Sequence, residues 1–107
     1  MISIDDFSKI EMRVGVVTEA VDVEGSNKLI KLNVSFGDEN RTIFTGVRTY
    51  GYVAGDFQDK KFLFVTNLEP KKIMESESQG MILAVDGPDD KPVFVSAEGL
   101  PIGAKVR

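Results

Sequence analysis

Residues 30–47 read IKLNVSFGDENRTIFTGV and carry the clearest structural signal in the chain. Apolar and polar side chains alternate over residues 30–36, which is the period of a strand with one buried face. Residues 37–40 form a turn signal, and residues 41–47 are again rich in β-branched and aromatic side chains. This stretch therefore predicts a β-hairpin.

Regular structure is also expected on the N-terminal side of this hairpin. Residues 5–10 begin with capping carboxylates and predict a single helical turn. Residues 12–17 alternate with a period of two and predict a strand, in which Gly15 indicates a bulge or a sharp bend. A polar turn at residues 23–27 separates this strand from the hairpin.

The C-terminal side begins with residues 48–59, which lose periodicity and predict a crossover with at most a turn of helix. Residues 61–67 are apolar on both faces, so we expect a buried strand there. Pro70 cannot donate to a strand ladder, and a loop is therefore expected over residues 68–80.

Two further strands are expected at residues 81–85 and 92–95, followed by an apolar tail over residues 99–107. Five main strands, an irregular first strand and a crossover between the third and fourth are typical of a Greek-key barrel. We therefore predict an all-β fold, a five-stranded Greek-key OB-fold barrel with a short flanking helical turn and a C-terminal extension. At 107 residues, the chain is expected to form a single domain, 1–107.

The composition excludes much of enzyme chemistry. The chain has neither cysteine nor histidine, which removes disulfides, thiolate nucleophiles, imidazole bases and Cys/His zinc sites. Carboxylate pairs such as Asp89 and Asp90 lie in predicted turns, where carboxylates usually serve local hydrogen bonds. No glycine-rich loop matches the phosphate-binding patterns. We expect a protein without catalysis, cofactor or metal.

The longest apolar runs, such as residues 62–65 and 81–85, are far shorter than the roughly 20 residues that cross a bilayer. Asp5 and Asp6 stand where a signal peptide would have its basic region. A cytoplasmic protein without membrane contact is therefore expected.

The net charge of −4 argues against a general polyanion binder, but the charge is unevenly distributed. Residues 28–72 hold eight basic and five acidic side chains, a local net charge of +3. A basic face that selects one shaped anion is one interpretation of this segment. A mixed, solvated surface is the other.

The predicted loop after residue 67 joins the ends of two strands that we expect to be neighbours. Asn67 and Ser78 would then lie close together, beside Lys71 and Lys72, in a patch suited to phosphate, sugar and base-edge contacts. In the alternative interpretation, Asn67 and Ser78 satisfy loop backbone groups and Met81 begins a core strand.

Other candidate contacts are weaker when taken singly. Lys28 lies at the mouth of the predicted hairpin and Arg13 on the polar side of the first strand, and either alone is typical of a solvated surface charge. Phe44, Tyr50 and Tyr52 offer rings on which bases can stack. We expect Phe44 in the core and the two tyrosines at its rim.

Five motifs are spread in order over almost the whole chain: DFSKIEMRVG at 6–15, SNKL at 26–29, FTGV at 44–47, NLEPKK at 67–72 and SQGM at 78–81. Together they resemble the tRNA-binding domain family. Within that family, VEGSNKL at 23–29 is most similar to the version appended to bacterial methionyl-tRNA synthetases, where many relatives carry a His-Pro pair.

The resemblance implies an OB-fold that binds tRNA by its shape, without catalysis, and that forms a homodimer through elements flanking the barrel. The family residues carried over are Arg13, Lys28, Asn67, Lys71, Lys72, Ser78 and Met81. Met81 is expected to support the surface from behind. Glu75 and Glu77 depart from the glycine-rich, less acidic loop of much of the family.

The resemblance also implies a partner in aminoacylation, a synthetase catalytic domain in cis or in trans. The chain is too short to hold that domain, so a detached C-terminal domain and a free-standing subunit both remain open. The apolar tail residues from Leu100 to Val106 predict a dimer contact, or else cover one barrel opening. A chaperone-like or protein-interaction module of the same fold is the alternative function, which the acidic composition favours.

Overall fold

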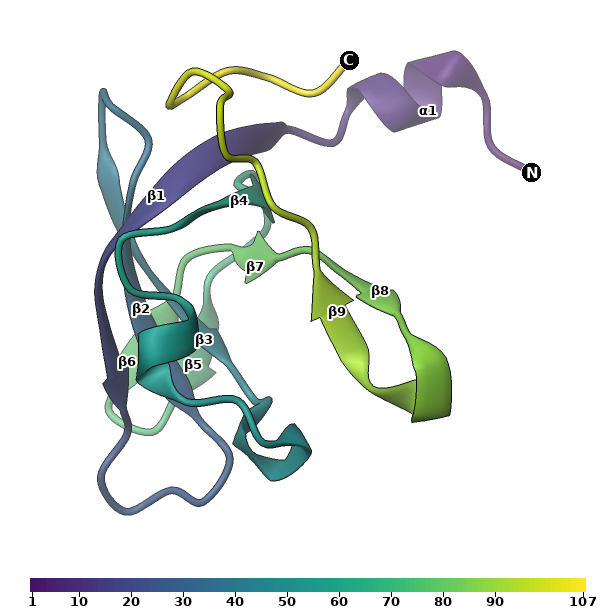
Figure 1. Cartoon of the computed structure of the whole chain (residues 1–107). Coiled ribbons are helices and arrows are strands. Elements are labelled where there is room, and N and C mark those ends of the chain that lie inside the picture. Colours follow the sequence, from purple (N-terminus) through teal and green to yellow (C-terminus); the bar gives the residue numbers. More distant parts are fainter.

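The computed structural model describes residues 1–107 and contains a five-stranded antiparallel sheet in the order β3-β2-β1-β4-β7 (Figure 1). Its strands are β1 (Met12–Asp22), β2 (Ile30–Ser35), β3 (Asn40–Thr45), β4 (Lys61–Val65) and β7 (Met81–Ile82). The long strand β1 pairs with β2 through its second half and with β4 through its first half. β1 therefore joins the two halves of the sheet.

The predicted hairpin is formed by β2 and β3, with Leu32 opposite Ile43 and Lys31 opposite Phe44. Ile30, Leu32 and Val34 are fully buried, and the residues between them are partly exposed. The period of two in the sequence thus corresponds to one face toward the core and one away from it.

The sheet closes on itself just before β7. The backbone N–H of Gln79 donates to the carbonyl of Thr42 on β3 at 2.8 Å, and its side-chain Oε1 accepts from the Thr42 N–H at 2.9 Å. At Gly80 a Cβ would lie 2.7 Å from the carbonyl oxygen of Val65, so only glycine fits this closure. The predicted five-stranded OB-type barrel is confirmed.

One continuous apolar core fills the barrel and includes residues from every strand of the main sheet. Its members are Val17, Ile30, Leu32, Val34, Phe36, Ile43, Val47, Phe57, Phe62, Phe64 and Ile82. Phe57 comes from the crossover, which holds the short 3₁₀ helices η1 (Arg48–Tyr50) and η2 (Ala54–Asp56). The crossover was predicted, and it supplies a core residue as well as a connection.

The predicted irregularity in the first strand lies elsewhere than at Gly15. The ladder between β1 and β4 runs without interruption through Gly15, and the register with β2 shifts between Val17 and Glu19. Gly15 is needed for packing, because a Cβ there would lie 2.5 Å from Val34 and 2.9 Å from Phe64. The bulge prediction at Gly15 was therefore wrong in position.

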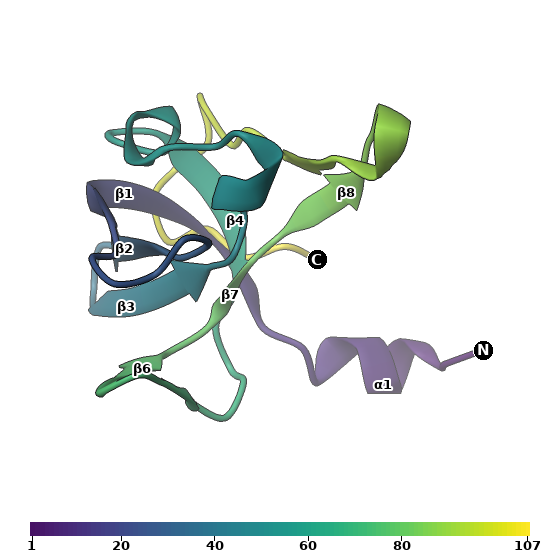
Figure 2. The ribbon, with the colours of Figure 1, turned by 90° about the horizontal axis from the view of Figure 1, so that it is seen from below.

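The predicted loop 68–80 contains a hairpin of its own, β5 (Lys71–Ile73) and β6 (Ser76–Ser78). The predicted strand 81–85 is interrupted at Leu83, so β7 ends and β8 (Ala84–Asp86) begins a separate ribbon with β9 (Pro92–Phe94). The 3₁₀ helix η3 (Pro88–Asp90) connects the two strands of this ribbon. Figure 2 shows the β5–β6 hairpin and the β8–β9 ribbon on opposite sides of the barrel.

The two chain ends lie beside the start of β1. The predicted helical turn is α1 (Ile4–Ser8), capped by Ser3, whose hydroxyl accepts from the N–H of Asp6 at 3.1 Å. The C-terminal tail runs along β1, where the N–H of Val14 donates to the carbonyl of Ala104 at 2.9 Å. No helix in the structure is long and apolar enough to span a membrane.

Candidate nucleic-acid interface

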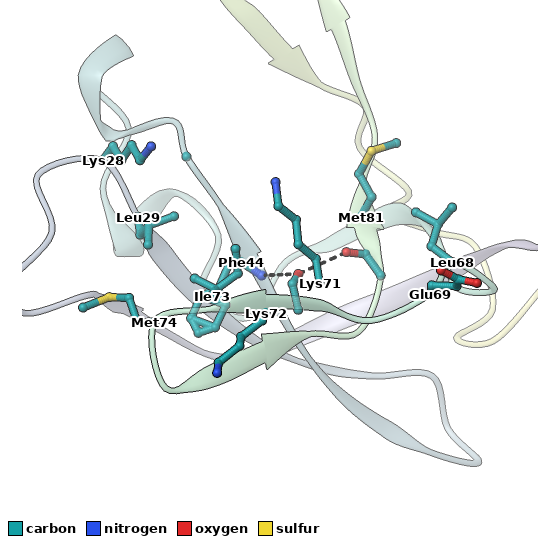
Figure 3. Close-up of a pocket in the computed structure, with 13 residues that line it drawn as sticks. Lys28, Leu29, Phe44, Leu68, Glu69, Lys71, Lys72, Ile73, Met74 and Met81 are labelled. Atoms are coloured by element: carbon teal, nitrogen blue, oxygen red, sulfur yellow. Dashed lines mark hydrogen bonds between the residues drawn. The ribbon is translucent and has the colours of Figure 1, made fainter.

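An open groove of about 960 Å³ lies between the β2–β3 hairpin and the β5–β6 hairpin (Figure 3). Residues far apart in the sequence meet there, since the 26–29 turn forms one side and the start of β7 the other. Five of the seven predicted site residues line this groove: Lys28, Lys71, Lys72, Ser78 and Met81. The structure thus gathers most of the predicted surface in one place.

The β5–β6 hairpin is held against the free edge of β3 by side chains. The N–H of Phe44 donates to Ser78 Oγ at 3.0 Å, and the same hydroxyl donates to the carbonyl of Gly80 at 3.2 Å. Ser78 is only 7% exposed. Its hydroxyl therefore satisfies backbone groups and positions the hairpin, as the alternative interpretation expected.

Arg41 fixes the same region from the end of the barrel. Its guanidinium donates to Glu39 Oε1 at 2.6 Å, to the carbonyl of Gln79 at 3.2 Å and to the carbonyl of Thr66. Arg41 and Gln79 were not among the predicted site residues, because the sequence gives no sign that a polar residue of one strand will reach this loop. They set the geometry of the groove without lining it.

The lysines of the groove are free of ion pairs, whereas the arginines near it are not. All six ion pairs involve other cations, and neither Lys28, Lys71 nor Lys72 takes part in any of them. Arg41 and Arg48 are paired with carboxylates of their own chain. Three lysines and one carboxylate, that of Glu69, line the groove, so a net positive charge remains there.

The two adjacent lysines face opposite ways, as consecutive strand residues do. Lys71 lies opposite the buried Ser78 across the hairpin and rises between Lys28 and Met81, whereas Lys72 points to the other side (Figure 3). Glu77 stands directly opposite Lys72 on that second side. Lys71 is therefore the better placed of the two for a ligand in the groove.

The turn that carries Lys28 is anchored by Arg48. The Arg48 side chain donates to the carbonyl of Ser26 at 2.6 Å, and its backbone N–H donates to the carbonyl of Lys28 at 3.2 Å. Asp22 lies 3.9 Å from the guanidinium. The Arg48 guanidinium is thus occupied by groups of its own chain, and Arg48 holds Lys28 at the rim of the groove.

Phe44 lies outside the core, and the expectation of a core position was wrong. Its neighbours Ile43 and Thr45 face the barrel interior and are buried, so the strand period turns Phe44 outward into the groove. Met81 is 47% exposed and lines the groove surface, whereas a position behind that surface was expected. The groove consequently has an apolar floor.

The tyrosines lie away from this groove. Tyr52 is half-buried at the rim of the core, with its ring centroid 5.2 Å from that of Phe94, and its hydroxyl donates to the carbonyl of Pro92 at 2.6 Å. Tyr50 is 48% exposed. Lys60 and Lys61 line a separate hollow beside Tyr52. The basic segment 28–72 is therefore divided between two surfaces.

Arg13 does not reach the groove. It is 8% exposed, and its guanidinium lies 2.9 Å from Asp38 and 3.4 Å from Glu39 and donates to the carbonyls of Phe36 and Gly103. The Arg13 guanidinium, through its hydrogen bond, holds the pKa of Asp38 below its usual value. Arg13 ties β1 to the β2–β3 turn and to the tail.

Asn67 does not line the groove either. Its Oδ1 accepts from the N–H of Glu11 at 2.7 Å and its Nδ2 donates to the carbonyl of Lys9 at 2.6 Å. The neighbouring Thr66 hydroxyl donates to Glu11 Oε1 at 2.7 Å and lowers the pKa of that carboxyl. Asn67 fastens the segment after α1 to the end of β4, so the expected pairing with Ser78 at one surface is not formed.

Comparison with known proteins places these features in a family. The family described as "Putative tRNA binding domain" matches residues 12–105. The chain is 44% identical to a methionine–tRNA ligase of Deinococcus radiodurans over 108 aligned residues, and 40% identical to that of Caldanaerobacter subterraneus over 105. These alignments cover 100% and 98% of this chain but only 16% of each ligase.

Solved structures of similar size show the same fold. A MetRS related protein from Pyrococcus horikoshii superposes with a TM-score of 0.93 at 41% identity, covering 100% of this chain and 98% of that one. The CsaA chaperone protein of Picrophilus torridus superposes with a TM-score of 0.87 at 29% identity, covering 100% of both chains. The sequence match over nearly the whole barrel shows that this chain belongs to the tRNA-binding domain family, in the branch related to methionyl-tRNA synthetases.

Proposed function

We propose that this chain is a non-catalytic module that binds tRNA through the groove between its two hairpins. The observation that carries the proposal is the pair Lys28 and Lys71, which converge without carboxylate partners on an otherwise acidic molecule. Phosphate groups of a nucleic acid are the ligands that such cations bind best. Membership of the tRNA-binding domain family indicates that this nucleic acid is tRNA.

The finer assignment is to methionyl-tRNA synthetase, either as its C-terminal domain or as a free-standing subunit. Identity of 44% to a methionine–tRNA ligase supports the first, and the MetRS related protein of nearly equal length supports the second. In both cases the module contributes by holding tRNA near a catalytic domain. Tethering raises the effective concentration of tRNA there even when each contact is weak.

Replacing Lys71 by alanine is expected to weaken tRNA binding and to reduce its dependence on salt. Each lost phosphate contact lowers the slope of log K against log [salt] by roughly 0.7 to 0.9. Lys60→Ala is the matched control, because Lys60 lines the separate hollow beside Tyr52. Binding of a folded tRNA is measured at several salt concentrations by fluorescence anisotropy.

The expected order of effect is Lys71→Ala larger than Lys72→Ala, with Lys28→Ala similar to Lys71→Ala. Equal slopes for the wild type and for the Lys28 and Lys71 variants would show that tRNA does not bind in this groove. An absence of binding by the wild-type protein would overturn the proposed function itself.

The proposed module also forms a homodimer through the face where α1 and the tail meet. Helix α1 buries no residue on its own barrel, and Ile4 is 78% exposed. Ile102 and Val106 of the tail are 44% and 36% exposed although their backbone lies along β1. A five-residue helix is not stable alone, so a partner surface of the same apolar kind supports it.

The dimer predicts a mass near twice 11.8 kDa at micromolar concentration in light scattering. The double variant Ile4→Asp, Val106→Asp is expected to give a monomer, because dimer formation would bury the introduced carboxylates without partners. Met74→Asp is the control, since Met74 is 57% exposed in the turn of the β5–β6 hairpin, at the tRNA groove. A monomeric wild-type protein would refute the dimer.

A chaperone-like module is the second candidate, favoured by the similarity to the CsaA chaperone protein of Picrophilus torridus. The apolar floor of the groove can take a hydrophobic side chain of an unfolded polypeptide as well as a nucleic acid. Competition between folded tRNA and a permanently unfolded protein discriminates the two. The tRNA module predicts that tRNA prevails at equal concentration.

A further inference from the structure

Phe44 occupies an exceptional position on the β2–β3 hairpin. The side chains on the outward face of this ladder are Lys31, Asn33, Ser35, Asn40, Thr42 and Phe44. Five of these six are polar and Phe44 alone is apolar. A large ring on a face that is otherwise suited to water calls for a partner.

The surroundings of the ring are apolar below and cationic above. Leu29 and Ile73 are half-buried beside it, and Met81 is half-exposed across the groove. Lys28 and Lys71 extend over the same hollow (Figure 3). Lys31 stands directly opposite Phe44 on β2, where facing side chains are close neighbours, and it also takes part in no ion pair.

An aromatic ring flanked by lysines suits an unpaired nucleotide of an RNA better than a double-helical segment. A double helix presents phosphates and riboses at its surface and keeps the faces of its bases stacked inside. The lysines alone would serve such a ligand, and the aromatic floor would have no role. An unpaired nucleotide offers a flat apolar base face with a phosphate on either side, which needs both a ring and flanking cations.

We propose that Phe44 is a stacking platform for one unpaired base of the bound RNA, with Lys28, Lys31 and Lys71 contacting the phosphates that flank this base. The inference rests on the proposed function and adds to it the kind of nucleotide that the groove selects. The groove volume of about 960 Å³ is at the upper end of pockets that enclose a small molecule, roughly 300 to 1,000 Å³. It therefore has room for a nucleotide.

Phe44→Ala is expected to weaken tRNA binding by roughly 5- to 150-fold, the loss found when a stacked base loses its aromatic partner. Phe44→Tyr keeps the ring and is expected to bind like the wild type. Phe44→Leu keeps apolar area without a ring and is expected to lose affinity as well. Because Phe44 is neutral, the salt slope is expected to stay unchanged in all three variants, unlike in Lys71→Ala.

Two further measurements separate the inference from the proposed function. A perfectly paired RNA hairpin closed by a short linker is expected to bind the wild type and Phe44→Ala equally, since it offers no free base to the groove. A short single strand containing 2-aminopurine is expected to change its fluorescence with the wild type and not with Phe44→Leu. Tyr50→Ala serves as the aromatic control outside the groove.

Phe44→Ala that binds tRNA as tightly as the wild type would overturn the stacking platform while leaving the lysine contacts intact. An equal loss of affinity for tRNA and for the paired hairpin would overturn it too, because that pattern indicates a damaged groove. A loss confined to unfolded polypeptide would assign the groove to protein ligands. Failure of Lys28→Ala and Lys71→Ala to alter binding is the separate result that would show that tRNA does not bind in this groove, and an absence of tRNA binding by the wild-type protein is the result that overturns the proposed function.

Discussion

Gly15→Val is expected to prevent the barrel from folding, and Gly15→Ala to lower the free energy of unfolding by about 1 to 3 kcal/mol. A Cβ at this position would lie 2.5 Å from Val34, 2.8 Å from Phe36 and 2.9 Å from Phe64. These three side chains are at most 1% exposed, so none of them can move into solvent. Every atom added to Gly15 must therefore push the core apart.

The measurement is urea denaturation followed by circular dichroism. Gly55→Ala is the matched control, because a Cβ at Gly55 meets nothing within 4 Å. A lower transition midpoint with an unchanged m-value is expected for Gly15→Ala and no loss of stability for Gly55→Ala. Equal stability of Gly15→Ala and the wild type would show that the core around Gly15 can accommodate a Cβ without loss of stability.

Arg13→Met is expected to lower the free energy of unfolding by about 2 to 4 kcal/mol. Methionine keeps an apolar stem but removes the donors to the carbonyls of Phe36 and Gly103 and the charge that faces Asp38. The Phe36 carbonyl is then left without this donor in a buried place. The carboxylates are partly exposed and regain water, which limits the loss.

Lys9→Met is the control for Arg13→Met, since Lys9 is 77% exposed and its ion pair with Asp6 spans one helical turn. Exposed pairs of this kind contribute about 0 to 1 kcal/mol, so little change is expected. The folded Arg13→Met protein is expected to keep the wild-type salt slope for tRNA. A reduced salt slope in an Arg13→Met protein of wild-type stability would instead show that Arg13 contacts tRNA.

The fold was predictable because its signals are local. The alternation over residues 30–36 and the turn at 37–40 specify a hairpin without help from the rest of the chain. The sequence also predicted a crossover at 48–59 and a buried strand from Lys61, both of which the structure contains. The β5–β6 hairpin was missed because Pro70 and the charged residues after it read as a loop.

The candidate site was predictable only in part. Lys28, Lys71 and Lys72 were identified by residue type and motif, and the barrel brings them to one groove. Arg13 and Asn67 were identified from motifs in the same way, but in the structure their side chains hold backbone carbonyls and amides. A motif cannot distinguish a residue that faces a ligand from one that builds the surface.

The sequence by itself determined the strand pattern, the barrel class, the absence of thiol and imidazole chemistry and the family. Only the tertiary structure decided which cations remain free. Arg13 and Arg48 pair with carboxylates far along the chain, and Arg41 donates to the distant carbonyls of Thr66 and Gln79, whereas the groove lysines take part in no ion pair. It also turned Phe44 outward and Lys72 away from Lys28. The physical reason is that side-chain alternation is local, whereas charge neutralisation and burial depend on which distant segments the closed barrel brings together.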